Sequence, residues 1–406
     1  GSFLSRFSAS VAALALAFGS SFLALQPASA AVTCLDGTWS IATNGTDCTK
    51  TFTPASAGTI TLPSAVTAAV VEIIGGAGGT GGDDGQLGSG PGQAGKVVGT
   101  ISLSGGSTLG IYPGNRGADG VDNATVNTAN LGAGAGGSAT ISGYDGGAGG
   151  GVGTYGASGG GAGGGAASVV TFGAVRFVAG GGAGGGGSGN IVAAEPASNS
   201  YVANGTSNAG AVGATTPNGS DGGGGGGGGG GHYGGAGGGI TWNTREYTGV
   251  GGYRGGNLTN GMASVTNTTV STSTAGTIKV TYTAQAAPTA VSTAKPTGTV
   301  TAGQTLTAAN TFTGQPEPTT FTYQWQASAD GSTNWSNVSG ATSSTLALNS
   351  SHVGKFIRVQ MTASNGVGTA ASSNSSATST AVSIAASSAP TLATASDTGS
   401  STSDKV

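Results

Sequence analysis

The stretch VVEIIGGAGGTGG, residues 70–82, joins five residues suited to a buried strand to a run of glycines. Residues 76–81 match the G-x-G-x-x-G pattern of dinucleotide-binding loops. That pattern requires a helix after its third glycine and an acidic residue about 20 positions further on. The next residues contain Pro91 and a glycine at every second to fourth position, and no carboxylate lies between Gly85 and Ala118. We therefore expect no cofactor, and we interpret the stretch as a sandwich strand that leaves its sheet and enters a glycine-rich body.

The composition of the chain separates this middle region from both ends. Of the 85 glycines in 406 residues, 69 lie between residues 75 and 256, and only 7% of all residues are charged. Lys, Glu, Arg and Gln are too scarce to form amphipathic helices, so the chain is expected to be all-β. The formal net charge is −3 and the basic residues are scattered. Because phosphate binding requires clustered Lys and Arg, we expect no nucleic-acid partner.

Four segments have the residue pattern of β-strands. Residues 166–180, AASVVTFGAVRFVAG, predict a hairpin in which Phe172 pairs with Val175 and Val170 with Phe177. Residues 96–112 predict a second hairpin, and TIKVTYT, residues 277–283, alternates as a half-buried strand does. Residues 59–74 supply the first strands. Their expected core positions are Ile60, Leu62, Val66 and Val70 onward.

The glycine runs between these strands can take two forms. An extended helix with three residues per turn has no internal hydrogen bonds, so its amide groups must bond to water or to neighbouring runs. Lateral packing requires that side chains be absent, a condition that runs of Gly with occasional Ala meet. The sequence favours an ordered bundle over a solvated coil, and leaves both open. The expected fold is a glycine-rich β-sandwich with extended glycine-helix insertions.

The first residues and the two cysteines predict export. Arg6, the apolar run 11–18 and the A-x-A motif that ends at Ala30 form a signal peptide with cleavage after Ala30, and a membrane anchor is the alternative. Cys34 and Cys48 are then expected to form a disulfide, with free thiols as the alternative. We expect no transmembrane segment beyond the signal peptide. The first residue is Gly and the last residues are TSDKV, which predicts a fragment of a longer chain.

Few residues are candidates for a functional site. Asp119 and Asp122 form a close acidic pair that is a weak calcium candidate, with a solvated loop as the alternative. Trp242, Tyr247 and Tyr253 lie in or near loops, where aromatic side chains can stack on a ligand, although most aromatic residues of strand-rich domains belong to the core. Neither histidine lies in a constellation of acid, base and nucleophile. We expect no catalytic residue, so the chain is predicted not to be an enzyme.

The region after residue 285 resembles a bacterial immunoglobulin-like repeat. The resemblance rests on GTVTAGQTLTA at 298–308, on residues 321–348 and on VGKFIRVQMTASNGVGTA at 353–370. It implies a second β-sandwich whose core contains Trp325, which alternates with polar neighbours along an inner strand. Phe356 stands where the family usually has the tyrosine of the corner motif, and the cysteine pair of antibody domains is missing.

Residues 51–284 resemble the secreted glycine-rich domains of bacterial proteins. The matching segments are 51–79, 95–117, 166–187 and 276–284. The arrangement is also similar to the glycine-rich extracellular region of anaplastic lymphoma kinase and its leukocyte relative. The last 17 residues resemble the opening of another repeat of very large bacterial adhesins.

Together these features divide the chain into a signal peptide (1–30), a short Cys-bearing segment (31–50), a glycine-rich β domain (51–284), an immunoglobulin-like domain (285–386) and a linker with a truncated further repeat (387–406). The predicted function is that of an exported, non-enzymatic protein of the cell surface or extracellular matrix. It would act in adhesion or structural interaction with an unknown surface ligand, such as a glycan, a protein or other cells. Accessory domains of a secreted enzyme and an ice- or surface-binding glycine bundle are the alternatives.

Overall fold

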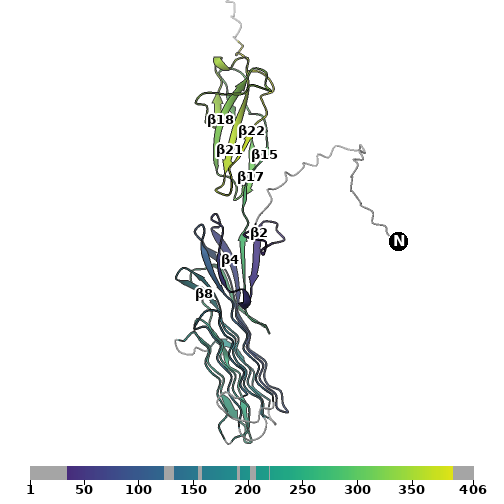
Figure 1. The fold of residues 1–406 in the computed structure, drawn as a ribbon, viewed down its shortest axis with the longest axis vertical. Helices are drawn as coiled ribbons and strands as arrows, with labels where there is room; N and C mark the ends of the chain where they lie inside the picture. Colours follow the sequence, from purple (N-terminus) through teal and green to yellow (C-terminus); the bar gives the residue numbers. More distant parts are fainter. Residues whose placement is uncertain are drawn as a thin grey trace, which may run out of the picture.

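The computed structural model describes residues 34–122, 132–153, 158–189, 193–201, 207–218 and 220–386 (Figure 1). The predicted signal peptide, its cleavage site and the predicted repeat at 387–406 lie outside these residues. The described part is all-β, as expected, and its only helical turns are two short 3₁₀ turns, η1 (Pro54–Ser56) and η2 (Ser350–His352). Within it, no helix has the length and apolar character needed to span a membrane.

Two antiparallel sheets form the first part of the molecule. The six-stranded sheet has the order β1-β2-β14-β4-β5-β13. Its strands are β1 (Ser40–Ile41), β2 (Asp47–Phe52), β4 (Ala68–Ile74), β5 (Ala94–Ser102), β13 (Ala263–Val270) and β14 (Thr277–Thr283). The four-stranded sheet has the order β3-β6-β7-β8. Its strands are β3 (Gly58–Thr61), β6 (Thr108–Tyr112), β7 (Ser168–Phe172) and β8 (Val175–Ala179).

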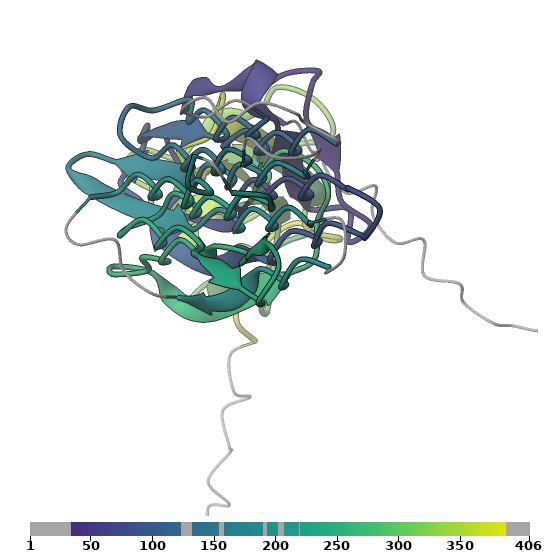
Figure 2. The same cartoon turned by 90° about the horizontal axis from the view of Figure 1, so that it is seen from below.

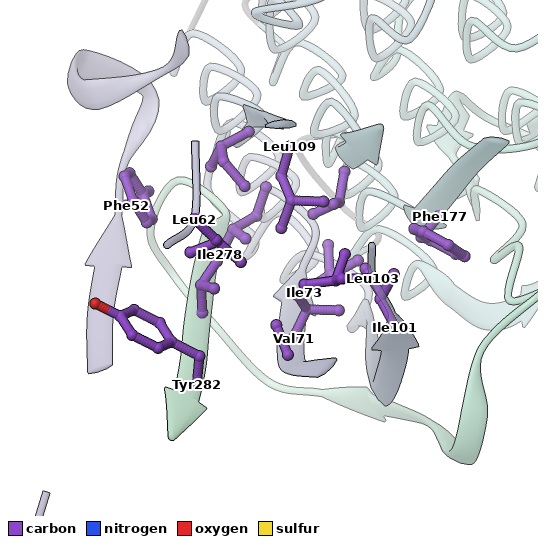
Figure 3. Close-up of a cluster of buried hydrophobic side chains, with 14 of the residues drawn as sticks. Phe52, Leu62, Val71, Ile73, Ile101, Leu103, Leu109, Phe177, Ile278 and Tyr282 are labelled. Carbon is purple, nitrogen blue, oxygen red and sulfur yellow. The ribbon is translucent and has the colours of Figure 1, made fainter. Parts of the chain in front are cut away.

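A single hydrophobic core lies between the two sheets (Figure 3). Val71, Ile73 and Ile101 enter it from the six-stranded sheet, and Leu109 and Phe177 from the other. The expected core positions Leu62 and Val66 are buried, as are Ile278, Val280 and Tyr282 of β14, and Ile60 packs against the core. The expectation for Val70 was wrong, because it is 43% exposed on the outer face.

One of the two predicted hairpins forms. β7 and β8 pair with Phe172 opposite Val175 and Val170 opposite Phe177, as the sequence predicted. The prediction for residues 96–112 was wrong, because β5 and β6 belong to different sheets. Ile101 and Leu109 are buried in the same core from opposite sides, so the segment between them crosses from one sheet to the other.

The N-terminal segment is attached to the six-stranded sheet. β2 pairs with β14, and Cys34 is disulfide-bonded to Cys48 of β2, which confirms the predicted bond. Trp39 is buried against the rings of Phe52 and Tyr282. The backbone N–H of Leu35 donates a 2.7 Å hydrogen bond to the Tyr282 hydroxyl. The disulfide therefore holds a short segment over one end of the core.

The glycine runs form a body bonded through its backbone. We call the described residues of 75–256 that lie outside β5 to β8 the glycine body. Every N–H from Gly159 to Ala167 donates a hydrogen bond, and every C=O from Gly159 to Ala166 accepts one, with lengths of 2.8–3.2 Å. Successive N–H groups of this run donate in rotation to three other runs, 182–188, 115–121 and 144–150. Successive C=O groups accept in rotation from 224–230, 76–82 and 134–137. Every third residue of 159–167 therefore bonds to the same partner run. Figure 2 shows the runs as winding traces packed side by side.

Close packing explains why this region is glycine. A Cβ built on Gly163 would overlap the carbonyl oxygen of Ala135, and one on Gly226 would overlap that of Gly184. The run 222–231 is enclosed in the same way as 159–167, since its amides bond to runs on several sides. The stretch 75–82 that resembles a dinucleotide loop follows β4 and is one of the runs of this body. No helix follows it in residues 83–93, which are all described.

The strands of the C-terminal part form three sheets around a second core. The four-stranded sheet has the order β19-β18-β21-β22, with β16 paired to β20 and β15 paired to β17. The strands are β15 (Ala286–Ser292), β16 (Thr305–Thr307), β17 (Thr311–Gln315), β18 (Thr320–Ser328), β19 (Ser336–Asn337), β20 (Thr345–Ala347), β21 (Phe356–Ser364) and β22 (Ala371–Asn374). Trp325 is fully buried at the centre of this core. Phe356 is half-buried and packs on Gly331 in the turn after β18.

Candidate interaction site at the tip of the glycine body

The glycine runs end together at one level, which we call the tip. Gly82 donates to the carbonyl of Gly160, Ser188 donates to that of Gly82, and Gly224 donates to that of Gly159. These bonds place the ends of four distant runs in one cross-section. Figure 1 shows that the runs extend from the first two sheets in the direction away from β15 to β22.

Two aromatic residues form a pair at the tip. Trp242 ends β10 (Ile240–Trp242) and lies opposite Tyr247, which begins β11 (Tyr247–Gly249). Their ring centroids are 4.9 Å apart and the planes are tilted by 54°. Trp242 is 52% exposed, whereas Tyr247 is half-buried. The N–H of Tyr247 donates to the carbonyl of Asp221, and its own carbonyl accepts from Gly223, so the pair is fixed to the glycine run that begins there.

The turn between the two strands is ordered by local bonds and carries strain. The N–H of Asn243 donates to the carbonyl of Glu246, and the Asn243 side-chain oxygen accepts from the N–H of Arg245 at 3.2 Å. Thr244 has a φ of 83°, which is unfavourable for a β-branched residue. Such a conformation costs on the order of 1–3 kcal/mol and is found mostly at functional sites.

Tyr253 does not join this pair. It begins β12 (Tyr253–Arg254), which pairs with β9 (Ser198–Tyr201), and its carbonyl accepts from Gly229. Tyr247 contacts the same glycine run six residues earlier, at Gly223. The structure therefore brings together two of the three aromatic residues that the sequence singled out, and places Tyr253 closer to the sheets.

The tip also collects negative charge. Between residues 75 and 256 the chain has eight carboxylates, and all except Asp145 follow or precede a run end at the tip: Asp83, Asp84, Asp119, Asp122, Glu195, Asp221 and Glu246. Asp84 is 6% exposed, and its Oδ2 atom is buried without a hydrogen-bond partner. Burial raises the pKa of Asp84, and the charges of Asp221 and Glu246 raise it further.

The carboxylates of the calcium candidates Asp119 and Asp122 accept hydrogen bonds from groups of the protein itself. Asp119 accepts from the N–H of Thr80 at 2.7 Å and forms an ion pair with Arg116. Burial acts to raise the pKa of Asp119, but the Arg116 and Thr80 hydrogen bonds and the Arg116 charge outweigh it and hold the pKa below its usual range. Asp122 accepts from the N–H of Asp83 at 2.8 Å. In the described residues, no three His, Cys, Asp or Glu side chains lie close enough to hold a metal ion.

Sequence reasoning missed the turn residues Thr244 and Arg245 and the buried Glu246. The signal was present, because the polar residues 243–246 separate two short β-prone segments in TWNTREYTG. Glu246 is 2% exposed, and a Cβ at Gly189 would overlap its carboxylate, which only the packed structure reveals. The tip thus presents one exposed indole and a polar turn, with carboxylate side chains around them.

No protein-family model matches the chain, and no curated protein matches it.

Proposed function

We propose that the chain is an exported, non-enzymatic protein of the cell surface or extracellular matrix that acts in adhesion or structural interaction. The observation that carries this proposal is the exposed Trp242–Tyr247 pair at the end of a body bonded through its backbone. Such a body holds its tip at a fixed distance from the sheets. The Cys34–Cys48 disulfide supports export, because disulfides persist in oxidising compartments.

We further propose specific forms for the two modules. The return of each partner run at every third residue supports extended glycine helices with three residues per turn. The buried Trp325 on an inner strand, with its indole N–H donating to the carbonyl of Ser343 at 2.8 Å, supports an immunoglobulin-like fold for residues 285–386. In this proposal the C-terminal module is a spacer, and the glycine body presents the contact surface, as in adhesin-like proteins of bacteria.

Adhesion of beads coated with the full chain tests this proposal. The beads are offered to immobilised bacterial cells and to extracellular matrix preparations, and retention under flow is measured. Retention should fall for Trp242→Ala and stay unchanged for Tyr233→Ala. Tyr233 is a matched control, because it is 40% exposed and lies at the opposite end of the run 222–231. Its ring is also paired with an aromatic neighbour, since the centroids of the Tyr233 and His232 rings are 4.4 Å apart and the planes are tilted by 48°. The proposal is wrong if coated beads are retained no better than bare beads on every surface.

A further inference from the structure

We propose that the Trp242–Tyr247 pair binds carbohydrate, and that it takes an uncharged pyranose, with the C–H face of the sugar ring on the exposed indole of Trp242. This inference rests on the proposed function, since it names the class of ligand for the same tip. The argument uses the exposure of the pair, the rigidity of its support and the charge around it.

The side chains of the pair belong to none of the buried hydrophobic clusters that the structure describes. The three clusters of buried hydrophobic residues in the described part of the chain include neither Trp242 nor Tyr247. Leaving half of an indole in water forfeits the stabilisation that burial of a large aromatic side chain would give. A surface indole that is held in place by a neighbouring ring is therefore available to cover the apolar face of a ligand.

The support of the pair is rigid, which favours binding of a weak, hydrated ligand. Trp242 and Tyr247 close a two-stranded ladder, and Tyr247 is bonded through its backbone to Asp221 and Gly223. Ordering of a loop on binding would reduce affinity, and this loop is already ordered. The flanking side chains of Thr241 and Arg245 are exposed and can exchange hydrogen bonds with sugar hydroxyl groups.

The charge of the tip selects among sugars. Glu246 directly precedes Tyr247 in the chain, and the backbone carbonyl of Asp221 accepts from the N–H of Tyr247. The exposed carboxylates of the tip are those of Asp119, Asp122 and Glu195. Of the basic residues between 75 and 256, all of which are described, Arg245 is the one in the tip turn, while Arg116 is paired with Asp119. This surface repels uronic acids, sialic acids and sulfated glycans, because all of them are negatively charged. An uncharged hexose or N-acetylhexosamine meets no such repulsion.

Calorimetric titration of the full chain tests the proposal with two sets of probes. The neutral set is cellopentaose, laminaripentaose, mannopentaose and chitopentaose, and the anionic set is oligogalacturonate, a hyaluronan oligosaccharide and heparin. At least one neutral probe should bind with a Kd below about 10 mM, and Trp242→Ala should weaken it at least about tenfold. Tyr233→Ala should leave the Kd unchanged, and both variants should unfold at the wild-type temperature.

Three results would overturn the proposal. They are no binding of any neutral probe, binding of anionic probes alone, or full binding by Trp242→Ala. The bead assay separates these failures from a failure of the proposed function. If Trp242→Ala reduces bead retention while no neutral sugar binds, the tip is adhesive but its ligand is not a neutral glycan. If beads are not retained on any surface, the proposed function itself fails.

Discussion

The α-carbon of Gly164 packs directly on the carbonyl oxygen of Gly228, and the space between these two enclosed runs has no room for a methyl group. Gly164→Ala should therefore push apart runs whose amides bond in several directions. Overpacking of a core typically costs about 1–3 kcal/mol, and this site should lie at or above the upper value because the overlapping atom belongs to the backbone. Urea unfolding followed by circular dichroism measures the loss.

Gly239→Ala is the control for this substitution. Nothing lies within 4 Å of a Cβ built on Gly239, and its φ is not positive. Alanine there should leave the free energy of unfolding within about 0.5 kcal/mol or raise it slightly, because it restricts the unfolded chain. Equal losses for both variants would show that glycine is needed in this region for some reason other than close packing.

Removal of the disulfide should destabilise the first two sheets. The bond joins residues separated by 14 positions, and closure of such a loop restrains the unfolded chain by about 3 kcal/mol in the entropic model. The double variant Cys34→Ser/Cys48→Ser should lower the free energy of unfolding by about that amount. The loss should be absent when the wild-type and variant proteins are compared under reducing conditions. A loss that persists in reductant would point to packing of Cys48 in the core.

The strand pattern predicted some elements of this fold and failed at others for definable reasons. The alternation in 277–283 fixes which side of β14 is buried. In VVEII both valines are apolar, so the pattern cannot decide that Val71 faces the core while Val70 faces water. The partners β5 and β14 decide it. The segment between Ile101 and Leu109 has the length of a hairpin loop, and only the shared core shows that it crosses between sheets.

The residues of the tip could be predicted only in part, because a run of glycines has no side-chain pattern that shows which other runs it packs against. Any run of Gly can pack on any other, so the sequence does not show that Ser188, Gly82 and Gly160 meet. Without that register, the carboxylates beyond the run ends are scattered in the sequence and meet only in the fold. Trp242, Tyr247 and Tyr253 were identified together because they lie in or near loops, and only the ladder of β10 and β11 shows that Tyr247 is the partner of Trp242.

The stability of the tip should depend on the ionisation of Asp84. Its pKa is raised in the folded protein above the ordinary value of an aspartate, because burial and then the charges of Asp221 and Glu246 disfavour the anion. The proton is bound more tightly by the folded state, so the contribution to stability is full below the unfolded pKa and is lost as the pH rises through the folded pKa. Asp84→Asn should therefore gain stability relative to wild type as the pH rises from about 4 to 8.

Asp119→Asn supplies the opposite case. The folded pKa of Asp119 is lowered, so its contribution is present above the unfolded pKa and is lost as the pH falls. This variant should be less stable than wild type near neutral pH and approach it in acid. Hydrogen exchange of tip amides, measured across the same pH range, follows both variants locally. A pH-independent difference between wild type and Asp84→Asn would show that the pKa of Asp84 is not raised in the folded protein.

Thr244 links the strain of the tip to its proposed ligand. Glycine adopts a φ near 83° without steric cost, so Thr244→Gly should relieve the strain and raise the free energy of unfolding by up to about 1 kcal/mol. Glycine also gives the backbone of the turn more conformational freedom in the folded protein. The exposed Trp242 ring should therefore lose part of its fixed orientation. We expect the variant to unfold at a higher temperature and to bind the neutral pentasaccharides more weakly, with calorimetry measuring both. If binding is unchanged while stability rises, the strained turn serves only the chain reversal and has no part in orienting the indole.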